Sequence, residues 1–186
     1  MTALIERGIY VLRKKGNRSF QVFQGSSLSA VKDEAPSLFV KISTWTGRVE
    51  LRDEPSQDVI ATSKRKSWSS KYDVQIAQTQ PDNHTVTLQR AGIFTTKRFF
   101  ALPSGMKCVV KRGSSTGQYV VFDLQSNDIL ATFEKSVSFR KAGVLRLHAP
   151  GHSQQDLTSL FMAIATMLKI AQDRQRSAAS ASNGSV

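Results

Sequence analysis

Most of the chain alternates between apolar and polar residues with a period of two, which is the pattern of half-buried β-strands. In the segment 38–44, "LFVKIST", the apolar side chains are Leu38, Val40 and Ile42. A Thr-Gly turn follows, and the next segment, "RVELRD", alternates in the same way. The two segments together predict a β-hairpin.

The same pattern continues almost to residue 148. Further strand-like segments are 58–66, 71–78, 85–89, 106–112, 118–124, 129–135, 136–141 and 144–148. The five residues "GSSTG" are typical of a hairpin loop, and Ala142-Gly143 is predicted to be the turn of a last hairpin. About eleven or twelve short strands with turn signals every 8–12 residues or so favour an all-β barrel or sandwich.

One segment near the carboxyl end breaks the alternation. From Gln154 to about Arg174 nothing interrupts a helix, and Ser153 followed by Asp156 resembles a capping box at its start. The stretch "LTSLFMAIATMLKIA" (157–171) within this segment is apolar around most of the circumference of such a helix. A helix of this kind is buried in protein or lies in lipid.

The length of the apolar run decides between these two environments. Spanning a bilayer takes about 20 apolar residues, whereas this run is shorter and includes Lys169. We therefore expect a buried helix and no transmembrane span. A closed twelve-stranded antiparallel β-barrel wrapped around the helix would cover it on every side and leave no free sheet edge.

The order of these elements resembles the tubby C-terminal-like superfamily, which includes the tubby domain, the LURP-one-related proteins and the phospholipid scramblases. Residues 38–69 resemble its early strand pairs, and residues 117–172 resemble its last strands and terminal helix. The resemblance implies a twelve-stranded barrel around a central C-terminal helix, closest to a small stand-alone LURP-one-related or tubby-like protein. The tubby domain's phosphoinositide-contacting motif has no counterpart at particular positions here.

The resemblance covers roughly residues 37–172, which we take as the core of one domain spanning residues 1–176. Residues 177–186, "SAASASNGSV", are small and polar and are expected to form a disordered tail. Cys108 is the single cysteine, so no intramolecular disulfide can form, and the N-terminus has no uninterrupted apolar signal sequence. These features favour a cytoplasmic protein, which we expect to be a monomer.

The catalytic motifs G-x-x-x-x-G-K-[ST], H-E-x-x-H and G-x-S-x-G do not occur in the sequence. We therefore expect no enzymatic activity, no cofactor and no metal. Cys108 is expected to be a buried thiol because it lies in an apolar strand. Trp45 and Trp68 lie beside turns, and the rim of the core is favoured for both over a stacking surface.

Charge is the most informative chemistry of the chain. Lys and Arg number 26 against 14 Asp and Glu, a formal net charge of +12, which favours anionic partners. The basic clusters lie at predicted strand ends or turns, where side chains from one rim of a barrel could converge on a phosphate. The candidate ligand-binding residues are Lys64, Arg65, Lys66, Lys97, Arg98, Lys111, Arg112, Arg140 and Lys141.

The sequence thus predicts a non-enzymatic module that docks on anionic phospholipid or phosphoinositide headgroups, peripherally at a membrane. One alternative is a regulatory or adaptor protein that binds an acidic protein or nucleic acid and shuttles to the nucleus. Nucleic acid is less favoured because no recognition helix, zinc module or aromatic platform is apparent. A second alternative is that the cations only solvate the surface.

Overall fold

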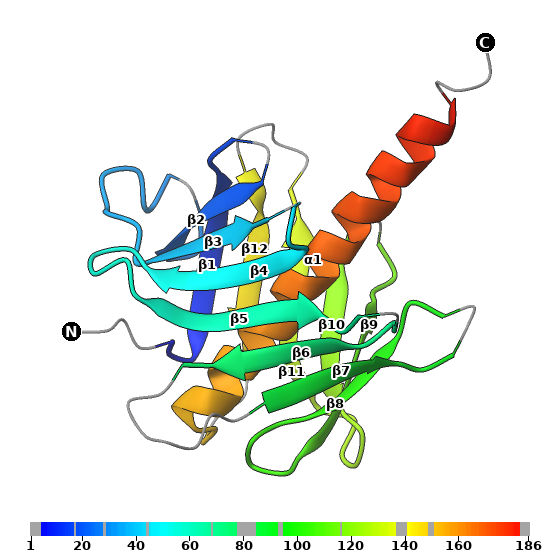
Figure 1. Ribbon diagram of the computed structural model, residues 1–186. Coiled ribbons are helices and arrows are strands. Elements are labelled where there is room, and N and C mark those ends of the chain that lie inside the picture. The colour runs from blue at the N-terminus through cyan, green and yellow to red at the C-terminus, as the bar shows by residue number, and fades with distance from the viewer. Residues whose placement is uncertain are drawn as a thin grey trace.

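Twelve antiparallel strands close into a barrel around one long helix in the computed structural model (Figure 1). The structure describes residues 5–16, 18–27, 29–43, 45–67, 69–77, 85–92, 95–115, 117–136, 141–148 and 151–182. The strands are β1 (Gly8–Lys14), β2 (Ser19–Gln24), β3 (Leu38–Ile42), β4 (Arg48–Asp53), β5 (Val59–Arg65), β6 (Tyr72–Ile76), β7 (Thr85–Arg90), β8 (Arg98–Ala101), β9 (Lys107–Arg112), β10 (Tyr119–Asp123), β11 (Ile129–Lys135) and β12 (Lys141–Leu147). The expected fold class is confirmed.

The barrel is closed by its first and last strands. β1 pairs antiparallel with β12, from Gly8 opposite Leu147 to Arg13 opposite Lys141, and pairs with β2 on its other side. The core therefore begins well before residue 37, since Ile5 is already fully buried. The expected core of 37–172 was too short because it left out the hairpin of β1 and β2. This hairpin closes the barrel, so that the sheet has no unpaired edge strand.

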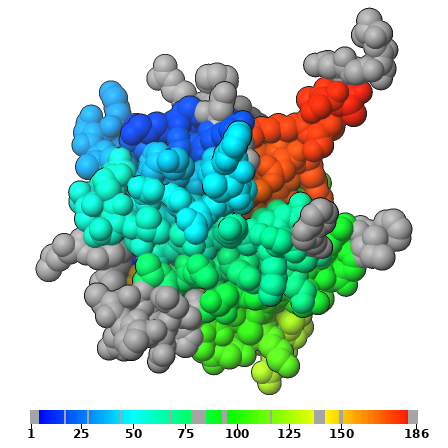
Figure 2. Space-filling view, viewed as in Figure 1, coloured from blue at the N-terminus to red at the C-terminus, as the bar shows by residue number. Residues whose placement is uncertain are grey.

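The helix α1 (Gln154–Ser182) begins where the capping box predicts. The backbone N–H of Asp156 donates to the Ser153 hydroxyl at 3.2 Å. Every side chain from 157 to 167 is buried, including Phe161 at 1% exposure, so the expectation of a helix sheathed by strands is confirmed. Residues 177–182, in the segment expected to be a tail, continue α1, and this end emerges from the barrel in Figure 2.

The polar arc of α1 is buried as well, and its hydroxyl groups find partners inside the barrel. Thr158 and Ser159 donate to the carbonyls one turn earlier, both at 2.8 Å. Thr166 reaches across to β5 and donates to the Ser63 hydroxyl at 2.8 Å, with both residues fully buried. Hydrogen bonding of this kind removes most of the cost of burying a hydroxyl. Within the described residues, no helix is long and apolar enough to cross a membrane.

The predicted turn at Ala142-Gly143 is wrong, because both residues lie inside β12. A Cβ at Gly143 would come within 2.3 Å of the Glu134 carbonyl oxygen and 2.4 Å of the Phe133 ring. The glycine therefore serves a close approach between β12 and β11. A pair of small residues such as Ala-Gly is typical of a turn in a sequence. In this protein the pair instead allows β11 and β12 to lie close together.

The hairpins β4–β5 and β10–β11 repeat the same turn, six strands apart in the ring of twelve. In the first, the Ser56 hydroxyl donates to Asp53 at 2.7 Å, and in the second the Ser126 hydroxyl donates to Asp123 at 2.8 Å. The sequences that carry them, "RDEPSQDVIATSKR" and "FDLQSNDILATFEK", align without a gap at an offset of 70 residues. The two halves of the barrel thus share one turn design.

The two turns differ in the hydrogen bonds that their first carboxylate accepts. The backbone N–H of Gln125 donates to Asp123 Oδ1 at 3.0 Å, whereas the equivalent position in the first turn is Pro55, which has no N–H. Asp53 is fully buried, and its Oδ1 has no hydrogen-bond partner. The missing donor at Pro55 accounts for this orphaned oxygen.

We predict that Pro55→Gln stabilises the protein. A hydrogen bond to the Asp53 carboxylate is worth about 1.5–3 kcal/mol, and the greater freedom of the unfolded chain offsets about 0.4–1 kcal/mol, so the net gain is about 1 kcal/mol. The urea midpoint at unchanged slope measures it. The reciprocal variant Gln125→Pro should lower the urea midpoint. A lower midpoint for Pro55→Gln would contradict the claim that the missing backbone donor at Pro55 costs stability.

Candidate functional site

The two rims of the barrel are distinguished by the helix that runs between them. We call the rim beside the first turn of α1 the start rim; there Asp156 accepts a hydrogen bond from the backbone N–H of Ser104 at 3.1 Å. We call the opposite rim, where the helix leaves, the exit rim. The odd-numbered strands end at the exit rim and the even-numbered strands begin there, because neighbouring strands are antiparallel.

Basic side chains gather at the exit rim. They occupy terminal strand positions or adjoining turns: Lys14, Lys15, Arg18, Arg48, Lys64, Arg65, Lys66, Lys71, Arg90, Lys97, Arg98, Lys111, Arg112 and Lys135. Acidic side chains gather instead at the start rim: Asp33, Glu34, Asp53, Glu54, Asp58, Asp123, Asp128 and Asp156. Among the described residues, cations therefore outnumber carboxylates at the exit rim, although Asp73 and Glu134 also lie there. The start rim carries some cations as well, among them Arg7, Lys32 and Lys107.

Strand alternation selects which of these cations point toward the helix. In β5 the buried residues Ala61 and Ser63 face inward, so Arg65 continues the inward-facing row where the barrel opens. The corresponding positions in β7, β8 and β9 are occupied by Arg90, Arg98 and Arg112. The same row that packs the core thus ends in arginines at the exit rim.

These arginines form a cleft against the side of α1, which we call the arginine cleft. Its volume is about 340 Å³, and its lining consists of Arg65, Ser70, Tyr72, Arg90, Arg98, Ile170, Asp173, Arg174 and Ser177. A small recess beside it is shared by Arg98, Arg112 and Arg174. The arginine cleft therefore joins residues from β5 to β8 with the part of α1 between Ile170 and Ser177, where the helix leaves the barrel.

Arg98 is the most buried of the cleft cations, with 5% of its surface exposed. Its guanidinium donates to the Ser70 carbonyl and lies 5.0 Å from the centre of the Tyr72 ring. Burial lowers the pKa of Arg98, and the positive charges of Arg90 and Arg174 lower it further. Arg90 is its direct partner across β7 and β8, and like charges in such a pair are destabilising, so an anion in the cleft would relieve this repulsion.

Asp173 is the one carboxylate among the described side chains that line the cleft. It forms an ion pair with Lys169, which lies one turn earlier in α1 and is only 4% exposed. The ammonium of Lys169 also lies 5.6 Å from the centre of the Tyr72 ring. Because the charge of Lys169 balances that of Asp173, the cleft has a net positive charge from its arginines.

The structure brings together three of the nine candidate residues, namely Arg65, Arg98 and Arg112. Lys64, Lys66 and Lys97 are exposed at the exit rim but do not line the cleft, and Lys111 lies over the outer Phe122 ring at 4.4 Å. Arg140 lies outside the described residues. Lys141 begins β12, and its side chain is also outside the description.

Sequence reasoning missed Arg90 and Arg174 as members of the site. The signal for Arg90 was present, because it follows Val86 and Leu88 in the inward row of β7. Arg174 could be placed only once the exit point of the helix was known. Trp45, expected at the rim of the core, is instead 97% exposed in the β3–β4 turn at the exit rim, and Trp68 lies outside the described residues.

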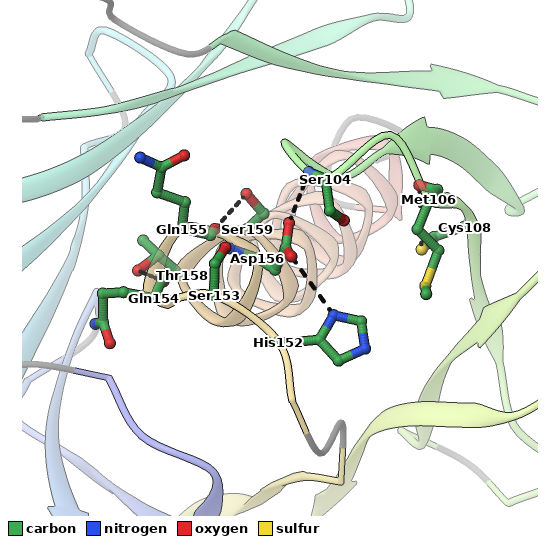
Figure 3. Close-up of polar contacts among 10 residues, drawn as sticks. All are labelled: Ser104, Met106, Cys108, His152, Ser153, Gln154, Gln155, Asp156, Thr158 and Ser159. Atoms are coloured by element: carbon green, nitrogen blue, oxygen red, sulfur yellow. Dashed lines mark hydrogen bonds and ion pairs between the residues drawn. The ribbon is translucent and has the colours of Figure 1, made fainter.

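The start rim holds a buried polar network rather than a second basic site (Figure 3). Asp156 is 2% exposed, and its carboxylate lies between the backbone N–H of Ser104 and the ring of His152, whose Nδ1 is 3.5 Å away. These contacts fix the first turn of α1 to the β8–β9 turn. Among the described residues, no three His, Cys, Asp or Glu side chains are placed to share a metal ion.

The thiol of Cys108 lies in the same region and is fully buried, as predicted. Burial raises its pKa to about 12, with the negative charges of Asp123 and Asp156 adding to the effect. The thiolate is the nucleophilic form of cysteine. Cys108 therefore remains protonated and unreactive near neutral pH.

Comparison with known proteins finds a structural neighbour and no sequence relative. No protein-family model and no curated protein matches the chain. The structure is similar to the X-ray structure of a protein from Arabidopsis thaliana, with a TM-score of 0.55 and 14% sequence identity over 94% of this chain and 99% of that chain. At this identity the similarity shows a shared fold and nothing further.

We predict that Cys108 reacts with a thiol reagent only when the protein unfolds. At pH 8 the native protein should label no faster than it unfolds, because the raised pKa leaves almost no thiolate. The same protein in urea should label fully within the same time. Rapid, stoichiometric labelling of the native state would contradict the buried, protonated thiol.

Proposed function

We propose that this protein is a non-enzymatic binding module that docks its exit rim on an anionic phospholipid surface and holds a headgroup phosphate in the arginine cleft. The observation that supports the proposal most strongly is the convergence of Arg65, Arg90, Arg98 and Arg174 on one cleft. Structural ion pairing alone would not assemble these arginines. Of the lining side chains that the structure describes, only Asp173 is a carboxylate, and it already has Lys169 as its partner.

The chemistry of the cleft suits a phosphate. Guanidinium groups bind phosphate oxygens through paired hydrogen bonds. Arg98 is held in place by Ser70 and Tyr72 before any ligand arrives, so little side-chain freedom is lost on binding. A volume of about 340 Å³ lies within the usual range for small-ligand sites.

The wider exit rim suits a membrane surface. Each cation beside an anionic bilayer contributes about 1 kcal/mol, and the rim carries many outside the cleft, among them Lys64, Lys66 and Lys97. Trp45 is almost fully exposed at the same rim, and tryptophan favours the boundary between headgroups and acyl chains. The tryptophan favours a lipid partner over nucleic acid or an acidic protein.

The order of strands and helix lends further support. It matches what the resemblance to the tubby C-terminal-like superfamily implies, and the tubby domain of that superfamily has a phosphoinositide-contacting motif. The arginine cleft uses residues of its own, so the resemblance supports the class of ligand and not the positions of its contacts.

We predict that the triple variant Arg65→Gln, Arg90→Gln, Arg174→Gln loses most vesicle binding. Three cations at about 1 kcal/mol each correspond to an affinity loss of about 100-fold. The measurement is flotation at about 0.1 M salt with phosphatidylcholine vesicles that contain phosphatidylserine and a phosphoinositide, against phosphatidylcholine alone.

The matched control is the triple variant Arg7→Gln, Lys32→Gln, Lys107→Gln, which removes the same charge from exposed positions at the start rim. It should keep most of the binding. Equal losses of vesicle binding in the two variants would show that only the net charge of the protein matters. Equal binding of the unaltered protein to anionic and neutral vesicles would exclude docking on anionic lipid. Binding to duplex DNA with a steep salt dependence, without vesicle binding, would favour the nucleic-acid alternative.

A further inference from the structure

A serine on the exposed part of α1 forms part of the wall of the arginine cleft. Ser177 is one of the cleft-lining residues, and its side chain is exposed. Within the described part of the chain, its hydroxyl makes one hydrogen bond, to the Asp173 carbonyl one turn earlier at 3.1 Å. The hydroxyl is therefore accessible to solvent while it stands beside the arginines.

The residues before Ser177 provide a basic recognition pattern. Arg174 and Arg176 stand three positions and one position before the serine. Basophilic protein kinases select substrates by such a pattern, because acidic groups on the kinase attract arginines that precede the target hydroxyl. The carboxyl-terminal part of α1 projects beyond the barrel (Figure 1). Most side chains of α1 from residue 174 onward are exposed, so local unwinding can present Ser177 to an enzyme.

We propose that Ser177 is a phosphorylation site whose phosphate folds back into the arginine cleft and excludes the headgroup phosphate. This inference rests on the proposed function for its regulatory consequence. In the modification step, the Ser177 oxygen attacks the γ-phosphorus of ATP on a basophilic kinase. The bond from that phosphorus to the β–γ bridging oxygen breaks, ADP leaves, and the hydroxyl proton passes to the catalytic base of the kinase.

The charges around Ser177 favour this docking. A phosphoserine carries about −1.5 to −2 charge near neutral pH and forms charge-assisted hydrogen bonds with clustered arginines. The four arginines of the cleft supply such donors. The nearest acidic group on the helix is Asp173, whose charge is already held by Lys169.

Competition with an external ligand follows from the position of the serine. The phosphate would be attached to the wall of the site itself, so its effective concentration would exceed that of a headgroup at a distant membrane. Phosphorylation would thus release the protein from the membrane through the same arginines that dock it.

The first experiment tests phosphate docking without any lipid. Phosphoserine is installed at position 177 during translation, and its second pKa is followed by phosphorus NMR. The arginines should lower that pKa by about one unit or more from the ordinary value of about 6, and the double variant Arg65→Gln, Arg90→Gln should abolish most of this shift. Phosphoserine at position 180 is the matched control, because Ser180 is one turn further along the exposed helix and does not line the cleft. A position 177 signal that titrates like position 180 would overturn the docking.

The second experiment measures the consequence. Phosphoserine at position 177 should weaken binding to the anionic vesicles at least about tenfold, while phosphoserine at position 180 should have a much smaller effect. Equal weakening by both, or none by position 177, would overturn the competition. If the unmodified protein does not bind vesicles, the proposed function fails, and the NMR result still decides whether the phosphate occupies the cleft.

The third experiment tests the modification itself. The full chain is incubated with ATP and a purified kinase that selects arginine three positions before serine, and phosphopeptides are located by mass spectrometry. Phosphate should appear on Ser177 and be strongly reduced in Arg174→Gln. Absence of phosphate at Ser177 in the unaltered chain would overturn the assignment of a kinase site.

Discussion

The structure depends on the mutual burial of one apolar helix and the inner face of one closed sheet. Phe161 and Ile164, each 1% exposed, occupy the interior that the strands enclose, and without the helix that interior would be an empty apolar cavity. Without the barrel, α1 would expose apolar side chains around most of its girth, which a helix in water does not tolerate. Neither part is expected to be stable alone.

The same constraint places the candidate site. Inward-facing rows of the strands must be apolar where they meet α1, and they become charged where the barrel opens around the departing helix. Arg65 and Arg98 occupy these last inward positions in β5 and β8. The arginine cleft is therefore a continuation of the packing pattern into solvent, and Arg174 completes it because the helix leaves along that side.

Local patterns in the sequence predicted what depends on local physics. The helix start at Ser153, the buried helix and the alternating strands followed from periodicity and capping chemistry. The pairing of β1 with β12, the close approach at Gly143 and the grouping of Arg90 with Arg174 depend on contacts between residues far apart in the chain. The repeated turns around Asp53 and Asp123 leave a match in the sequence that was not predicted as a repeat, and the closed ring shows that they lie half a barrel apart.

The most direct test of the buried helix is native-state hydrogen exchange along α1. Residues 160–167 lie within the fully buried stretch, so their amides should exchange only through global unfolding, with the same free energy as denaturant unfolding. Amides of residues 174–181 should exchange rapidly by fraying. Exchange of residues 160–167 at a free energy well below that of global unfolding, while the strands remain protected, would contradict a barrel built around its helix.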